Sequence, residues 1–430
     1  MNAQLGGLRA LLAGPSSRKA LRNFQTRRLR ALVRHAYARV PYYRRLFDRA
    51  GLTPQDIGTL EDLQRIPTSQ KIDFRDLPET DVIARGVDPG RIVHYSTSGS
   101  TGVPMVVRCT RFESRLLQVF RMQVMMRLGL RVTDRRSFLL TVRGADRPGI
   151  LERFGLFRGK RTHPMWPRER IMADFREWKP HVIRGYPSAL SSLASELTDD
   201  DRAQIRPRFI TTDSEDLAPH MRRQIEQGFG VPVFDLYDCF ECNVIAWQCP
   251  TGRQYHVMDA AVIVEVLHDG RPAAPGESGE VVITSLHSWA APLIRYRIGD
   301  LVERGLDRCP CGAPNSCITR VQGRVQDRLV VADGRSINPQ RVVAWIYPLL
   351  SNLRRYQIVQ EAIDRIVIKL QPVPTAPPNP EQVEAMKHLI TRDLGDAIRL
   401  HVELVEDIPS EPSGKFRSFR CLVPQHEISG

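Results

Sequence analysis

The chain alternates between two patterns over residues 181–239, where HVIRGYPSALSSLASEL (181–197), RFITTDS (208–214) and APHMRRQIEQGFGVPVFDLYDC (218–239) follow one another. Three short apolar runs are separated by two helical patterns, one opened by Pro187 and the other ended by Gly230. Strand, helix, strand, helix and strand at these lengths predict parallel pairing in a layered α/β sheet. Ligands bind such sheets at the carboxyl ends of the strands. We therefore expect TTDSEDL and YDCFEC, which follow two of these strands, to lie at a binding site.

The segments on either side differ from this central stretch. Towards the N-terminus, helical patterns are separated by Pro and Gly; one of them, residues 60–76, reads as a helix, a turn at Pro67 and a helix restarting at Ser69. After Tyr255, short β segments with a turn at Asp269 and Gly270 predict an antiparallel β subdomain. Beyond residue 323 a hairpin, two helices and several strands predict a compact α+β unit. The expected fold class is α/β: a large layered domain with a β subdomain over residues 1–323, and a small α+β domain over 324–430.

Composition narrows the class of protein. The 430 residues are 42% hydrophobic and 26% charged, as in ordinary globular proteins. No window reaches the ~18 uninterrupted apolar residues of a membrane span, and no convincing signal peptide is present. We therefore expect a cytoplasmic protein without an integral membrane segment. It carries no aromatic–basic interleaving or groove-reading motif, so we expect no nucleic-acid partner.

The net charge of +14 has its strongest local source in residues 1–47, which contain no Asp or Glu. Three interpretations are open. The stretch could attract a polyanion such as nucleic acid, anionic lipid or an anionic substrate, or it could be an Arg-rich transit peptide. The third interpretation, which we favour, is an amphipathic helix with a solvated basic face and with Leu29, Leu32, Val33 and Tyr37 turned inward.

A loop rich in hydroxyls and glycine occurs in HYSTSGSTGVPMVV, residues 94–107, just before a short predicted strand, PMVVRCT. A P-loop would place a lysine after its last glycine, but Val103 follows Gly102 here. What is left is a set of hydroxyls and backbone N–H groups that could cradle a phosphate, with glycines that permit close approach. A plain surface turn is the alternative for the loop taken alone.

Six segments in a fixed order then point to a family: STSGSTGVP, TTDSEDL, YDCFE, RYRIGD, GRVQDRL and SGKFR. Together they resemble the adenylate-forming ligases, the superfamily of acyl-CoA synthetases, adenylation domains and luciferases. LVRHAYARVPYYRRLF, HVIRGYPSAL and CPCG are similar to the phenylacetate–CoA ligase branch, including its capsule-biosynthesis relatives. The resemblance extends over nearly the whole chain.

The resemblance implies a nucleotide site. Glu241 matches the acidic residue that helps hold Mg²⁺, Tyr237 the aromatic that stacks on adenine, and Glu215 a further nucleotide-site position. The phosphates of ATP and the departing pyrophosphate would be held by Ser98, Gly99, Ser100, Thr101 and Gly102. The acyl pocket would draw on residues near Tyr186 and Pro187, on residues 211–215 and on Cys239.

The remaining assignments concern the ribose and the second domain. Asp300 matches the carboxylate that accepts both ribose hydroxyls, and Arg324 a basic residue near the hinge that contacts the nucleotide. Lys415 matches the mobile lysine that meets the α-phosphate and the carboxylate during adenylation, so the C-terminal domain is expected to move. Two positions depart from the family pattern. Asp238 replaces the usual glycine after the tyrosine, and Gln326 stands at the hinge where Asp or Lys is common.

Four cysteine and histidine residues suggest a metal. Cys249, His256, Cys309 and Cys311 supply three sulfurs and one nitrogen, the donor set of a closed tetrahedral Zn²⁺ site, and members of the resembled branch carry a structural zinc at similar positions. Reduced thiols without a ligand are the alternative, and Cys317 and Cys242 are spare candidates.

The leading hypothesis is an ATP-dependent, AMP-forming ligase that makes an acyl-adenylate from an aryl or arylacetic acid and passes the acyl group to CoA. A second hypothesis replaces CoA by an amine, as in capsule or natural-product assembly. A third is a nucleotide-binding regulator without turnover, although the presence of Lys415 speaks against it. ATP, Mg²⁺ and Zn²⁺ are the expected cofactors, the acid and CoA (or the amine) are the expected small-molecule partners, and a homodimer is left open.

Overall fold

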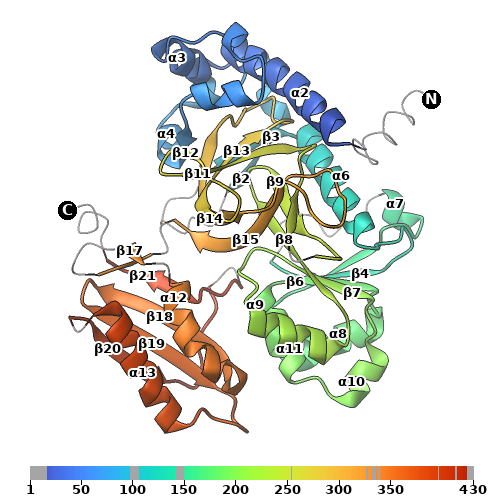
Figure 1. The fold of residues 1–430 in the computed structure, drawn as a ribbon. Helices are drawn as coiled ribbons and strands as arrows, with labels where there is room; N and C mark the ends of the chain where they lie inside the picture. The colour runs from blue at the N-terminus through green and yellow to red at the C-terminus, as the bar shows by residue number, and fades with distance from the viewer. Residues whose placement is uncertain are drawn as a thin grey trace. The chain divides into compact units, whose positions relative to one another are not determined.

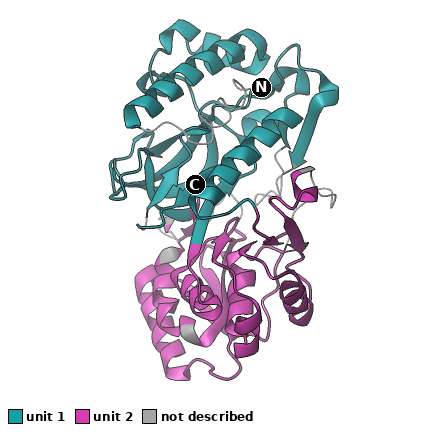
Figure 2. Ribbon diagram, turned by 90° about the vertical axis from the view of Figure 1, so that its right-hand side faces the viewer, with its two compact units in different colours: residues 1–132, 234–322 teal, residues 133–233, 323–430 magenta. Residues whose placement is uncertain are grey.

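A computed structural model describes residues 17–96, 106–141, 150–252, 254–325, 328–331, 336–337, 339–395, 397–411 and 414–423. The chain divides into two compact units, residues 1–132 with 234–322 and residues 133–233 with 323–430 (Figure 2). Among the described residues, no helix is both long and apolar enough to cross a membrane. The domain division that the sequence predicts, at residues 323 and 324, and the mobility of the second domain stay predictions.

The first unit carries antiparallel strands in the order β12-β11-β13-β14-β15-β10-β9-β8, with β1 pairing in parallel with β14. The strands are β8 (Val233–Cys239), β9 (Asn243–Gln248), β10 (Tyr255–Val257), β11 (Val262–His268), β12 (Arg271–Pro272), β13 (Ser278–Ser285), β14 (Tyr296–Arg304), β15 (Cys317–Arg324) and β1 (Ser69–Gln70). Asp269 and Gly270, with φ of 46° and 82°, form the turn between β11 and β12. The predicted antiparallel β subdomain is confirmed.

Helices and one hairpin complete the first unit. The longest helices are α2 (Arg18–Arg39), α3 (Pro41–Arg49) and α6 (Arg111–Arg127). β2 (Ile92–Ser96) pairs antiparallel with β3 (Val106–Thr110), which confirms the strand predicted in PMVVRCT. The short elements are η1 (Pro54–Asp56), η2 (Glu61–Arg65), α4 (Lys71–Arg75), α5 (Glu79–Val82) and η3 (Pro89–Arg91).

In the second unit, residues 133–233 form a parallel layer that contains the first two of the three strands predicted between residues 181 and 239. Strands β5 (Gly159–Thr162), β4 (Arg136–Leu139), β6 (Val182–Gly185) and β7 (Phe209–Thr212) lie in that order and pair in parallel. Helices α8 (Arg168–Trp178), α9 (Pro187–Ser195) and α11 (Pro219–Phe229) pack against them, with Met172, Leu190 and Ile225 fully buried (Figure 1). Gly230 ends α11 at a φ of 66°, as its sequence position predicts. The short helices are α7 (Ile150–Arg153) and α10 (Asp199–Gln204).

The rest of the second unit is an α+β layer with a core of its own. Its sheet has the order β20-β19-β18-β21, and α13 places Met386, Ile390 and Leu394 against that sheet. The hairpin predicted in RLVVADGRSI is confirmed, since β16 pairs antiparallel with β17. The elements are β16 (Leu329–Val330), β17 (Ser336–Ile337), α12 (Gln340–Ile346), η4 (Tyr347–Asn352), β18 (Leu353–Ala362), β19 (Arg365–Pro372), α13 (Pro380–Leu394), β20 (Arg399–Leu404) and β21 (Phe419–Cys421).

One local prediction is wrong. The sequence pattern predicts a helix before Pro67 and a restart capped by Ser69, whereas the structure has a five-residue 3₁₀ helix, η2, and a strand residue at Ser69. Ser69 is fully buried, and its N–H donates to the carbonyl of Arg295 at 2.9 Å, which adds β1 to β14. The Ser69 hydroxyl also donates to the carbonyl of Ile294 at 3.5 Å, so pairing with β14 engages the side chain that a cap would use. Helix α4 therefore begins at Lys71, with Gln70 as its N-cap.

Residues 18–39 of the N-terminal basic segment form the amphipathic helix that we favoured. Within α2, Leu29, Leu32 and Val33 are fully buried, while Tyr37 is half-buried. The arginines on its other side contact protein acceptors, including the carbonyl of Asp307 and the carboxylate of Glu61. Packing of the apolar stripe therefore accounts for the helix, as the periodicity predicts.

Candidate active site

Two residues that the sequence places 63 positions apart meet in the first unit. The hydroxyl of Tyr237, in β8, donates a hydrogen bond to Oδ2 of Asp300, in β14, at 2.8 Å. Both residues are buried, at 7% and 9% exposure. Burial, and then the neighbouring charge of Asp300, raise the pKa of Tyr237 well above its usual value, so the phenol stays a donor. The predicted adenine-stacking and ribose-binding residues thus form one hydrogen-bonded pair.

Glu241 lies in the turn that joins β8 to β9, and it is half-buried. This turn is held from both sides by Arg121 of α6, whose guanidinium donates to Asp238 before the turn and to Oδ1 of Asn243 after it, at 2.8 Å. The side chains of Arg121 and Asp238 are each only 12% exposed. Asn243 has a φ of 63°, a left-handed conformation that Asn tolerates better than most residues. Asp238, which replaces the family's glycine, is therefore the anchor of an ion pair.

Glu215 bridges two elements of the second unit. Its Oε2 accepts from the N–H of Ser188 at 3.1 Å, and its Oε1 accepts from the N–H of Phe416 at 2.6 Å. Burial raises the pKa of Glu215, whereas these two N–H groups and the charge of Lys415 lower it. A carboxylate so placed joins the start of helix α9 to the residue that follows Lys415.

Lys415 is half-buried, and backbone hydrogen bonds link it and Gly414 to Glu411. The N–H of Glu411 donates to the Lys415 carbonyl at 2.8 Å, and the N–H of Gly414 donates to the Glu411 carbonyl at 2.7 Å. Gly414 has a φ of 78°, and a Cβ there would lie 3.0 Å from both Pro164 and Thr141. Only glycine suits this position, because the backbone is left-handed and the neighbours leave no room.

Three further predictions have simpler outcomes. Arg324 is exposed and is the last residue of β15. The hinge residue Gln326 lies outside the described residues. So do the predicted phosphate-binding residues, which are Ser98, Gly99, Ser100, Thr101 and Gly102. The roles of all the predicted site residues stay predictions.

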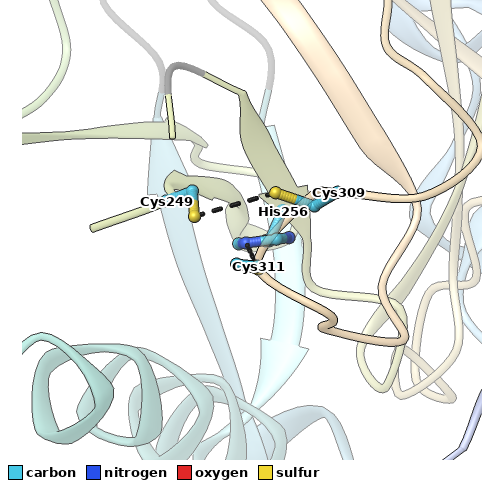
Figure 3. A group of neighbouring side chains, drawn as sticks. All are labelled: Cys249, His256, Cys309 and Cys311. Atoms are coloured by element: carbon cyan, nitrogen blue, oxygen red, sulfur yellow. Dashed lines mark hydrogen bonds between the residues drawn. The ribbon is translucent and has the colours of Figure 1, made fainter. Parts of the chain in front are cut away.

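The four predicted zinc ligands gather at one point of the first unit. Their ligand atoms all lie within 4.8 Å of one another, and the side chains point toward each other in Figure 3. Sγ of Cys309 lies 3.8 Å from Sγ of Cys249, and Sγ of Cys311 lies 3.4 Å from Nε2 of His256. The sheet explains this, because β10, which carries His256, lies between β9, which ends before Cys249, and β15, which follows Cys309 and Cys311.

The spare cysteines lie outside this group. Cys317 is buried beside Cys249 and Cys309, but its thiol lies 3.6 Å from the carbonyl of Asn315. Sγ of Cys242 lies 3.4 Å from Sγ of Cys239 in the β8–β9 turn.

Sequence reasoning missed three contributors: Arg121, which holds the Glu241 turn, and the backbone N–H groups of Ser188 and Phe416, which hold Glu215. Asp238 carried a partial signal, since an acidic residue in place of glycine beside a buried strand needs a cationic partner. The chain has too many arginines for the sequence to select Arg121.

Comparisons with known proteins identify the family of the whole chain. A phenylacetate–coenzyme A ligase from Thermus thermophilus is 30% identical over 372 residues, 82% of each chain, and one from Escherichia coli is 31% identical over 327 residues, 72% of each. Residues 329–420 match the family model described as the CapK C-terminal domain. A crystal structure of 2-hydroxyisobutyryl-CoA ligase with an acyl-AMP has a TM-score of 0.75, at 22% identity, covering 96% of this chain and 90% of that chain.

The fold and these relatives define the class as the adenylate-forming acid–thiol ligases, enzymes that use ATP and CoA. The α/β fold class and the resemblance stated from the sequence are confirmed. Within that class, the chain belongs to the phenylacetate–coenzyme A ligase family. Membership of a ligase family speaks against the third hypothesis, a nucleotide-binding regulator without turnover.

Proposed function

We propose that this protein activates an aryl or arylacetic acid with ATP and transfers the acyl group to CoA. The observation that carries the proposal is the buried Tyr237–Asp300 pair, because two family motifs far apart in sequence converge there. Membership of the phenylacetate–coenzyme A ligase family supports the choice of acid and of CoA.

The reaction has two steps. A carboxylate oxygen of the acid attacks the α-phosphorus of ATP, and the bond from that phosphorus to the pyrophosphate oxygen breaks. The CoA sulfur then attacks the acyl carbonyl carbon, its proton is lost to solvent, and AMP leaves. In the first step Asp300 would accept from the ribose hydroxyls, Tyr237 would stack on adenine, and Lys415 would place its ammonium at the α-phosphate oxygens, where negative charge builds up.

Glu241 would help to hold Mg²⁺, a hard cation that prefers oxygen ligands. The ion, when bound, would neutralise charge on the phosphates. Glu241 is suited to this because the Arg121 contacts with Asp238 and Asn243 hold both sides of its turn.

We also propose that Cys249, His256, Cys309 and Cys311 hold a structural Zn²⁺. The donor set fits this metal, since three thiolates and one imidazole form a closed tetrahedral site. Burial lowers the pKa of His256 and so favours the neutral ring that a metal needs, and its buried Nδ1 has no hydrogen-bond partner among the described residues. Such a metal would join the β9–β10 hairpin to the loop before β15.

A second candidate acceptor is an amine. The adenylation step is the same for both acceptors, so the acyl-adenylate does not distinguish them.

ATP–pyrophosphate exchange across a panel of aryl, arylacetic and aliphatic acids tests the first step. We expect label to return to ATP only with the preferred acids, and the absence of exchange with every acid despite ATP binding would refute the ligase proposal. Adding CoA or amines to the active mixture and weighing the product then separates thioester from amide.

A cytoplasmic location and a homodimer belong to the same proposal. Fractionation of cells that express the protein checks the first, and light scattering during gel filtration checks the second. A monomer mass across the working concentration range would rule out the homodimer.

A further inference from the structure

We propose that Glu215 is a positioning residue that docks the catalytic lysine for adenylation and releases it for thioester formation. The inference rests on the proposed role of Lys415. The sequence predicts only a nucleotide-site role for Glu215. The proposal adds a partner within the protein, the backbone next to Lys415.

The Glu215 carboxylate accepts hydrogen bonds both from helix α9 and from the lysine segment, which we define as residues 414–416. Ser188 is the second residue of α9, and its N–H has no carbonyl four residues earlier within the helix. Tyr186, at the N-cap, offers no side-chain acceptor, and Pro187 has no N–H. Glu215 therefore satisfies a helix donor with one oxygen and the N–H of Phe416 with the other.

Charge favours the docked position. Burial raises the pKa of Glu215, and the positive charge of Lys415 opposes that rise. Burial lowers the pKa of Arg355, while the negative charges of Asp407 and Glu215 raise it. The Arg355 guanidinium lies 5.0 Å from the ring centre of Phe416. Departure of the lysine segment would cost the half-buried carboxylate one hydrogen bond and one opposite charge. Glu215 therefore favours the arrangement in which the segment is docked.

Steric fit gives a second, independent reason. Glu411 is linked to Gly414 and Lys415 by backbone hydrogen bonds, and a Cβ on Gly414 would lie 3.0 Å from both Pro164 and Thr141. The segment therefore presents a preformed surface to residues of the 133–233 part of the second unit. Because these two hydrogen bonds do not involve Glu215, loss of its carboxylate should alter docking without breaking them.

The test compares Glu215→Gln with Glu196→Gln. Glutamine keeps the size of Glu215 but turns an NH₂ group toward one of the two backbone donors, so one contact is lost. Glu196 is the matched control, because it pairs with Arg354 of the C-terminal layer at 3.2 Å while both side chains are over one-third exposed. A pair as exposed as this contributes little. Thermal melting of both variants first establishes that they fold.

Three measurements follow. For Glu215→Gln we expect ATP–pyrophosphate exchange to fall about 10- to 100-fold, in line with loss of a hydrogen bond to a charged group. Thioester formation from synthetic acyl-adenylate and CoA should change less than about twofold. Hydrogen–deuterium exchange should show faster uptake in the peptide that contains Phe416, and Glu196→Gln should match the wild type throughout.

Unchanged deuterium uptake at Phe416 in Glu215→Gln would overturn the proposal, and so would an equal fall of both half-reactions, which would indicate a nucleotide or structural role. If the wild type shows no exchange with any acid, the proposed function fails. The deuterium measurement needs no acid and still decides whether Glu215 docks the segment.

Discussion

Replacing Tyr237 by Phe removes one hydroxyl and tests whether the Tyr237–Asp300 pair organises the ribose site. The lost hydrogen bond runs from a buried phenol to a buried carboxylate at 2.8 Å. A bond to a charged group contributes about 1.5–3 kcal/mol. At about 1.4 kcal/mol for each factor of ten, we expect the KM for ATP to rise roughly 10- to 100-fold if Tyr237 sets the orientation of Asp300.

Tyr255→Phe is the matched control. The Tyr255 hydroxyl donates to Oδ2 of Asp235 at 2.7 Å, so the same atoms are removed from a second Tyr–Asp pair in the same unit. Both variants should melt at a lower temperature than the wild type, with a smaller shift for the half-buried Tyr255. Only Tyr237→Phe should change the KM for ATP in the pyrophosphate exchange assay.

If Tyr237→Phe keeps its KM for ATP within about twofold while its melting temperature falls, Tyr237 does not orient Asp300 for the nucleotide. An equal rise of KM in both variants would also refute this role, because the effect would then be general destabilisation. With either outcome, the Tyr237–Asp300 pair would stabilise the sheet without preparing Asp300 for the nucleotide.

Three further outcomes follow from the structure. Lys415→Ala should suppress pyrophosphate exchange by at least about 100-fold while ATP binding by calorimetry stays within a few-fold, and equal loss of both would contradict the role of its ammonium. Purified protein should contain close to one zinc per chain by metal analysis; Cys309→Ser and Cys311→Ser should lower this content, while Cys421→Ser, outside the cluster, should keep it. Burial raises the pKa of Asp259 from 3.8 to about 6. Between these pH values the folded state therefore binds more protons than the unfolded state, so the stability that this group contributes falls as the pH rises from about 4 to about 6. Asp259→Asn should therefore gain stability relative to the wild type between pH 4 and pH 6 in urea unfolding, and a constant difference across that range would refute the assignment.

The alternation of strand and helix between residues 181 and 239 could be predicted because short apolar runs mark the strands and helical spacing of apolar residues marks the helices. Val182 and Ile183 are buried in β6, while Pro187 and Gly230 mark helix ends by backbone chemistry alone. These signals are local. Residues 60–76 misled because the decisive interaction of Ser69 is with Arg295, more than two hundred positions away.

The candidate site was readable only in part, for a similar reason. Motif order selected Tyr237, Glu241, Asp300 and Lys415, but no spacing in the chain says that Tyr237 donates to Asp300. The partners of Glu215 were beyond reach, because the N–H groups of Ser188 and Phe416 have no side-chain signature. Donors of this kind are visible only once the backbone is folded.

The aspartate at position 238 should restrict which residues position 121 can accept. A glycine there would need no partner, whereas an aspartate at 12% exposure depends on the Arg121 guanidinium, which also reaches Asn243. We expect relatives with glycine at this position to tolerate many residues at position 121, and relatives with aspartate to retain arginine. Mutational drift in α6 would then be constrained by a turn more than a hundred residues away, and a substitution harmless in one lineage would disable another.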